Sequence, residues 1–167
     1  ELLLHTGVTG SAARIGHRLT IVIQAWQAIV QWDGDEPVAV SVPVELDSLD
    51  VRRGEGGMTP LTGAEKALIR SNALKTLRAK KFPQAHFQSA TVSRGVSGYR
   101  LVGTLEIGGR TGSQVVDVEV AEDGESLSGA AVVRHTDYGI KQYSMLMGAM
   151  KVADDVRVTL TADIPEP

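Results

Sequence analysis

Apolar residues occupy every second position in several segments of this chain, and this alternation constrains the fold more than any other feature. In residues 99–107 the odd positions are Tyr, Leu, Gly, Leu and Ile, whereas the even positions are Arg, Val, Thr and Glu. Residues 116–120 and 156–164 repeat the pattern. A period of two predicts β-strands with one buried face. A consecutive set of such strands must either sandwich against a second sheet or curl into a barrel.

The first half of the chain is also rich in predicted strands. Residues 19–23 are β-branched and alternating, and residues 38–46 place Val or Leu at every even position. Residues 85–92 form a further candidate strand that precedes the alternating segments. The sequence therefore predicts a mainly β fold.

One α-helix interrupts these strands. Thr62 and Glu65 have the spacing of a capping box, in which the Thr hydroxyl accepts from the Glu amide and the Glu side chain reaches back. The apolar spacing that follows predicts a helix over about residues 63–78, which Phe82 and Pro83 would end.

Composition excludes several classes of function. The net charge is −3 and the charges are interspersed, which argues against a nucleic-acid-binding face. The chain has no cysteine, so disulfides, thiol nucleophiles and thiolate metal sites are excluded. No apolar run approaches the roughly 20 residues of a membrane span, so we expect no integral membrane segment. At 167 residues the chain fits one domain, and we assign residues 1–167 to it.

We find no catalytic constellation. The four histidines lack metal-ligand spacing, and no serine lies in a G-x-S-x-G elbow. Residues 9–16 resemble a dinucleotide-binding loop, but Arg14 stands where the middle glycine is needed and a β-branched segment follows. We therefore predict a protein that is not an enzyme and that has neither a metal site nor a cofactor.

The remaining feature is the large number of apolar side chains, which form either a solid core or the wall of an open interior. Gly103 lies at an inward position of its predicted strand, where a packed interior would normally place a side chain. This favours a barrel with space inside. We accordingly expect Gly103→Leu to plug an interior channel while the fold is retained.

Several motifs, in order along the chain, resemble the YceI-like family. Residues 81–89 (KFPQAHFQS) are similar to its signature K-[FY]-P-x-x-x-F-x-S, and residues 99–109 to its Y-x-V-x-G-x-L-x-I-x-G. Residues 137–140 match D-[FY]-G-[IL], and residues 154–156 then enter the last strand. The resemblance covers about residues 46–164, whereas the N-terminal part departs from the family pattern.

The resemblance implies an eight-stranded antiparallel, lipocalin-like barrel that binds polyisoprenoid or related long-chain lipids, often as a homodimer. Members occur both exported and cytosolic, and we expect a cytoplasmic protein because no leader is visible. Our leading hypothesis is a non-enzymatic binder or carrier of an isoprenoid-type lipid. The inward residues expected along the lipid tail are Leu19, Ile21, Ile23, Val40, Val42, Phe87, Leu101, Gly103, Leu105 and Met147. The donor or cationic side chains chosen for a polar or anionic head group are Arg14, His17, Arg134 and Lys141.

Two alternatives from other classes stay open. A β-domain could act through its outer surface as an interaction or stress-response module, with no lipid inside. An enzyme would need His17 or His86 to meet a carboxylate or tyrosine in a cleft.

Overall fold

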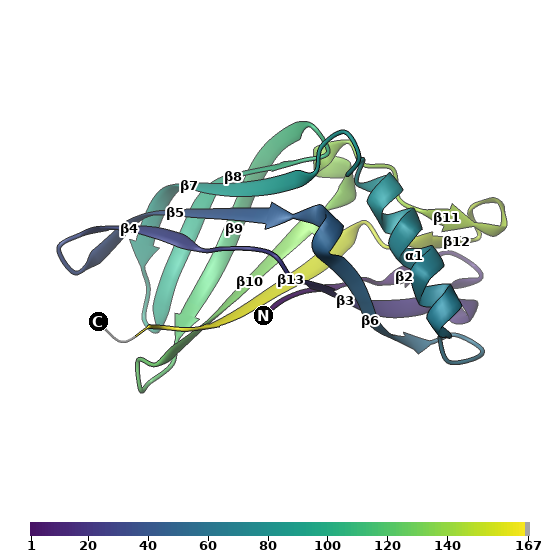
Figure 1. Cartoon of the computed structure of the whole chain (residues 1–167), viewed down its shortest axis with the longest axis horizontal. Helices are drawn as coiled ribbons and strands as arrows, with labels where there is room; N and C mark the ends of the chain where they lie inside the picture. Colours follow the sequence, from purple (N-terminus) through teal and green to yellow (C-terminus); the bar gives the residue numbers. More distant parts are fainter. Residues whose placement is uncertain (166–167) are drawn as a thin grey trace.

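The chain is built around one strongly curled antiparallel sheet of ten strands, described for residues 1–165 of a computed structural model (Figure 1). The strand order is β4-β5-β7-β8-β9-β10-β13-β1-β3-β6, and a small second sheet has the order β11-β12-β2. The predicted alternating segments all lie in the main sheet. Its strands are β1 (Leu2–His5), β3 (His17–Ile23), β4 (Ile29–Asp33), β5 (Glu36–Glu45), β6 (Leu49–Gly56), β7 (Gln84–Arg94), β8 (Gly98–Ile107), β9 (Arg110–Val120), β10 (Ser126–Arg134) and β13 (Asp155–Asp163). The small sheet comprises β2 (Val8–Thr9), β11 (Ser144–Met145) and β12 (Met150–Val152).

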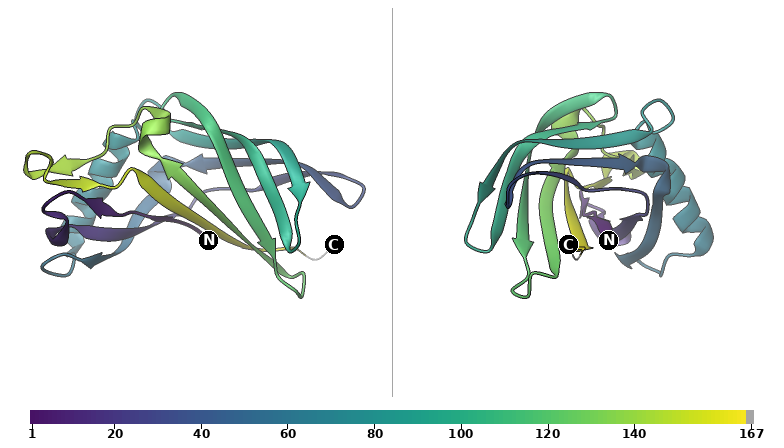
Figure 2. Two further views of the ribbon diagram at one scale, coloured as in Figure 1. Left: turned by 180° about the vertical axis from the view of Figure 1, so that it is seen from behind. Right: turned by 60° about the vertical axis from the view of Figure 1, so that its left-hand side comes forward.

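The expected eight-stranded closed barrel is wrong in strand number and in closure. The segment from β3 to β6 forms one long hairpin, and both of its arms are interrupted. Residues 24–28 separate β3 from β4 in the first arm, and the 3-10 turn η2 (Leu46–Ser48) separates β5 from β6 in the second. One hairpin therefore supplies four strands, two at each edge of the sheet. Among the described residues the edge strands β4 and β6 do not pair with each other, so the sheet is a curled half-barrel (Figure 2). At the corner the two arms are joined by backbone hydrogen bonds: the Glu45 amide donates to the Ala25 carbonyl at 2.9 Å, and the Gln27 amide donates to the Pro43 carbonyl at 3.2 Å.

The predicted helix is confirmed as α1 (Gly63–Thr76), with the capping box formed by Thr62 and Glu65. It ends two residues before the expected position, because Arg78 adopts a left-handed φ of 55° that no helix can continue. The helix lies alongside the edge strand β6 (Figure 1). Its inner side chains pack on a core that includes Ile23 and Leu49. No helix in the described part of the chain is both long and apolar enough to cross a membrane.

A short 3-10 turn, η3 (His135–Tyr138), contains Asp137 and Tyr138, the first two residues of the third family-like motif. The Asp154 carboxylate accepts from the Thr136 amide at 2.9 Å and from the Thr136 hydroxyl at 2.7 Å. These bonds hold the turn so that Tyr138, 1% exposed, fills the space beside Gly112. Asp154 therefore connects the start of β13 to η3 through these hydrogen bonds.

We expect Asp154→Ala to lower the melting temperature at neutral pH, with a difference that disappears in acid. The Thr136 hydrogen bonds hold the pKa of the Asp154 carboxyl below its ordinary value. A carboxyl with a depressed folded-state pKa stabilises the fold fully above its unfolded pKa, and this contribution is lost as the pH falls through the folded value. Thermal melts of wild type and variant between about pH 7 and pH 2 would measure this convergence.

Asp155→Ala is the matched control for that prediction. Asp155 pairs with Arg134 at 2.8 Å, but both side chains are more than half exposed. Exposed ion pairs contribute little to stability, so this variant should melt close to wild type throughout. If the melting temperature of Asp154→Ala stayed equally far below that of wild type at pH 2, the stabilising role of the ionised Asp154 carboxylate would be contradicted.

Candidate functional site

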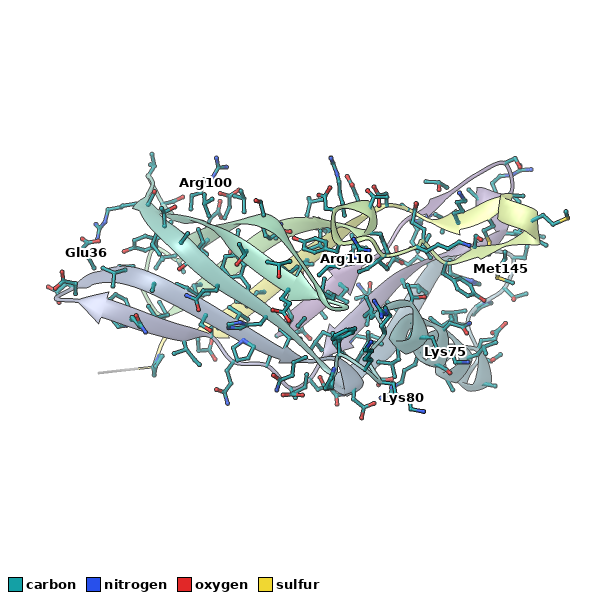
Figure 3. The ribbon with its side chains drawn as sticks, turned by 90° about the horizontal axis from the view of Figure 1, so that it is seen from above. Glu36, Lys75, Lys80, Arg100, Arg110 and Met145 are labelled. Carbon is teal, nitrogen blue, oxygen red and sulfur yellow. The ribbon has the colours of Figure 1, made fainter. Side chains whose placement is uncertain are left out.

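The curled sheet and α1 surround a cavity of about 1550 Å³ that runs along the length of the molecule. Its lining reaches from Trp32, near the β4–β5 turn, to Met145 in β11. Figure 3 places Met145 and Glu36, which begins β5, at opposite ends of the long axis. Since Trp32 and Met145 are 60% and 46% exposed, the cavity meets the surface at both ends.

The alternation in the strands produces an almost wholly apolar wall. In β13, Val156, Val158 and Leu160 line the cavity, whereas their neighbours Arg157 and Thr159 lie on the opposite face because successive side chains of a strand alternate. The same rule applies in β9 and β10. The wall is therefore a direct result of the period of two in the sequence.

Most of the residues expected along a lipid tail line this cavity. They come from four strands, β3, β5, β7 and β8, and four of them are less than 9% exposed. The residues that line it are Leu19, Ile21, Ile23, Val40, Val42, Phe87, Leu101 and Leu105.

Two of the expected tail residues are not placed as predicted. A Cβ at Gly103 would lie 2.0 Å from the Gln88 carbonyl oxygen, so this glycine allows close approach of β7 rather than space for a ligand. Met147 is fully exposed at the tip of the β11–β12 hairpin and points away from the cavity wall. The expectation that Gly103→Leu would only plug a channel is therefore wrong.

The candidates for a head-group site do not gather in one place. His17 lines the cavity, and its Nε2 lies 2.7 Å from the Thr59 carbonyl oxygen. Because a carbonyl only accepts, Nε2 donates this bond. Arg14 and Lys141 are exposed outside the lining, and Arg134 pairs outward with Asp155.

Sequence analysis missed a polar group at the β11–β12 end of the cavity. Asn72 of α1 donates from Nδ2 to the Tyr143 hydroxyl at 3.2 Å, so that one hydrogen bond crosses between the helix and the segment leading into β11. Both residues line the cavity, as does Lys151 of β12. Tyr143 and Lys151 lie in a segment without clean periodicity, and the helical pattern of α1 does not show which element Asn72 will meet, so no pattern in the sequence pointed to this group.

A second missed group lies inside the sheet. Gln114 lines the cavity, and its Oε1 accepts from the Tyr138 hydroxyl at 2.9 Å. Burial, together with the Asp137 charge, raises the pKa of the Tyr138 phenol, so it remains protonated and donates at neutral pH. Gln114 Nε2 donates in turn to the Val132 carbonyl at 2.8 Å. The interior polar atoms are thus satisfied by each other, and the cavity wall presents little unpaired polarity.

The described residues contain no group of three or more His, Asp or Glu side chains arranged to hold a metal ion. The cavity lining offers aliphatic walls that exclude water, with the Asn72, Tyr143 and Lys151 donors at one end.

Comparison with known proteins agrees with the fold and the motifs. The family model of the YceI-like domain matches residues 5–164. The crystal structure of BcnA from Burkholderia cenocepacia is similar, with 17% identity, a TM-score of 0.66 and coverage of 96% of each chain. The YCEI protein of Campylobacter jejuni has 17% identity and a TM-score of 0.60 over 87% of this chain and 85% of that one. A search among curated proteins found no match.

Proposed function

The chain belongs to the YceI-like family, and we propose that it binds and carries a long-chain isoprenoid-type lipid in the cavity of the curled sheet, without catalysing a reaction. The proposal treats the chain as one functional domain. It combines the lipid class that the family resemblance implies with the size and chemistry of the cavity.

The observation that carries the proposal is the volume of the cavity together with its apolar wall. At about 1550 Å³ the cavity exceeds the roughly 300–1000 Å³ of pockets for drug-sized ligands. Its length favours an extended chain over a compact molecule, because the lining continues between the two ends of the sheet.

The energetics of burial favour a long chain as well. Each buried methylene contributes about 0.8 kcal/mol, so a 20-carbon chain offers about 16 kcal/mol. Association and ordering cost about 4–15 kcal/mol. A short chain would not offset that cost, whereas a chain of this length does.

The polar end of the ligand is proposed to lie at the β11–β12 end. Asn72, Tyr143 and Lys151 line the cavity there and provide amide, hydroxyl and ammonium donors. These donors suit a hydroxyl or phosphate head group. His17, at the start of β3, is the sequence-derived candidate that lies on the same wall.

Native mass spectrometry with the C20 alcohol geranylgeraniol tests the proposal. We expect the purified protein to retain one geranylgeraniol molecule, or to release a co-purified long-chain lipid on organic extraction. Hexanol, with too few methylenes to offset the cost of association, should not be retained. A protein that carries no lipid and retains neither alcohol would contradict the proposal.

A row of valines on the outer face favours the second candidate, an interaction module. Val102 and Val115 are register partners on β8 and β9, and Val132 lies on the neighbouring strand β10. They are 40%, 41% and 51% exposed. An apolar row of this kind suits a protein partner, including a second copy of the chain. The two candidates differ in whether filling the cavity abolishes function.

A further inference from the structure

Three successive apolar side chains are exposed at the tip of the β11–β12 hairpin. We call Met145, Leu146 and Met147 the apolar tip; they are 46%, 53% and 107% exposed. The hairpin projects from the end of the molecule, beyond the main sheet (Figure 1), and Figure 3 shows Met145 at that extremity. An isolated exposed apolar residue needs no explanation, but three in succession at a projecting tip do.

The apolar tip is continuous with the cavity. Met145 and Leu146 belong to its lining, together with Ile15 of the 3-10 turn η1 (Ala13–Ile15). The Ala12 amide donates to the Ala149 carbonyl at 2.9 Å, which holds η1 against the hairpin. Ile15 is itself 43% exposed. A lipid that leaves the cavity at this end would therefore pass directly along the apolar tip.

The charges around the tip are positive. Residues 8–18 and 141–151 carry Arg14, Arg18, Lys141 and Lys151, and they contain no Asp or Glu. Within residues 1–165 none of these four cations forms an ion pair. The carboxylates that neighbouring elements bring to this end are engaged, Glu55 with Arg53 and Glu65 in the cap of α1.

The opposite end of the cavity has the opposite charge. The β4–β5 turn, residues 33–36, carries three carboxylates, of which Glu36 pairs with Arg94 of β7, and the β9–β10 turn, residues 121–125, carries three more. Trp32 is exposed there, but the carboxylates of these turns would repel an anionic surface. The molecule thus has one end that combines apolar and cationic side chains and one end that is acidic.

We propose that the apolar tip docks on the surface of an anionic lipid bilayer, with Met145, Leu146 and Met147 in the interfacial region and the four cations facing lipid phosphates. Apolar insertion combined with basic residues is what holds peripheral proteins at such surfaces. This inference rests on the proposed function, because it provides the route by which a membrane lipid reaches the cavity. The bilayer is favoured over a protein partner because the unpaired cations surround the tip on both adjoining segments.

The backbone of the tip allows a sharp test. Leu146 and Met147 have φ values of 52° and 55°, a region in which Asn is better tolerated than aliphatic residues. The double variant Leu146→Asn, Met147→Asn should therefore remove the apolar surface without unfolding the hairpin. Val96→Asn is the matched control, because Val96 is fully exposed in the β7–β8 turn, outside the cavity lining.

Flotation with phosphatidylcholine vesicles, with and without about 30% phosphatidylglycerol, gives the readout. We expect wild type and Val96→Asn to float with the anionic vesicles, and the double variant to bind at least about tenfold more weakly. Wild type and Val96→Asn should retain geranylgeraniol equally, because Val96 lies outside the cavity lining. Wild type that retains geranylgeraniol but ignores both vesicles would overturn the docking inference alone, whereas vesicle binding without geranylgeraniol would contradict the proposed function alone. Self-association of wild type that the double variant abolishes, without vesicle binding, would also overturn docking.

Discussion

Gly103→Ala is expected to destabilise the fold by about 3 kcal/mol or more. A Cβ at this position would lie 2.0 Å from the Gln88 carbonyl oxygen and 2.7 Å from the Ser89 Cα. Both atoms belong to the backbone of β7, so no side-chain rotation can relieve the overlap. The ladder between β7 and β8 must separate at a point where the register already shifts, between Ser89 and Thr91. Overpacking usually costs about 1–3 kcal/mol, and a forced backbone displacement exceeds this range. Urea unfolding monitored by circular dichroism would measure the loss.

Gly129→Ala is the control for that prediction. Gly129 is also a buried inward glycine of the main sheet, but a Cβ there would meet the Leu160 Cβ at 3.6 Å, an ordinary contact. This substitution should leave stability unchanged or raise it by up to about 1 kcal/mol, since it restricts the unfolded chain. Equal stabilities of Gly103→Ala and Gly129→Ala would show that the close approach of β7 and β8 does not depend on glycine.

The contrast between these glycines shows what the sequence could not reveal. Both lie on the inward face of their strands, and alternation alone does not distinguish them. What separates them is the distance to the next strand, which depends on the local bulge and curl of the sheet. Alternation determines which face a residue takes, but not how closely a neighbouring strand approaches it.

The same limit explains the error in strand number. The segments 99–107 and 156–164 were predicted closely, because long runs with one buried face leave little freedom. The break between β3 and β4 has no such signal, since residues 24–28 end one ladder and begin another on the opposite edge of the sheet. Strand β10 also escaped prediction, because its inward positions include Gly129 and Ala131, which are small and weakly apolar.

Some residues of the candidate site could be predicted from the sequence, and others could not. For residues within strands, such as Ile21 and Leu101, periodicity predicted the inward face and the family resemblance implied a lipid-binding interior, and both residues line the cavity. The polar group of Asn72, Tyr143 and Lys151 was not, because α1 and the β11–β12 hairpin meet only in the folded chain. Met147 was assigned inward from its apolar character, whereas the hairpin exposes it.

Gly129→Phe is expected to abolish binding of a long-chain lipid while the fold is retained. Gly129 lines the cavity and pairs in register with Leu160, which in turn pairs with Leu2, so an inserted ring would enter between the two ends. The backbone accepts a Cβ there without overlap. A ring that displaces about four methylenes removes about 3 kcal/mol of burial, which weakens binding at least about a hundredfold. Native mass spectrometry with geranylgeraniol, together with a thermal melt, would measure both quantities.

Val132→Phe separates the effect of the cavity from the effect of added apolar surface. Val132 lies on the same strand but on the outer face, where it is half exposed, so the same ring would enter solvent. We expect this variant to retain geranylgeraniol like wild type. If Gly129→Phe folds and still retains the lipid, the cavity is not the binding site, and the outer valine row becomes the better explanation of function. If Gly129→Phe alone loses the lipid, the binding free energy comes from the inner wall, because the two variants place the same ring on opposite faces of β10.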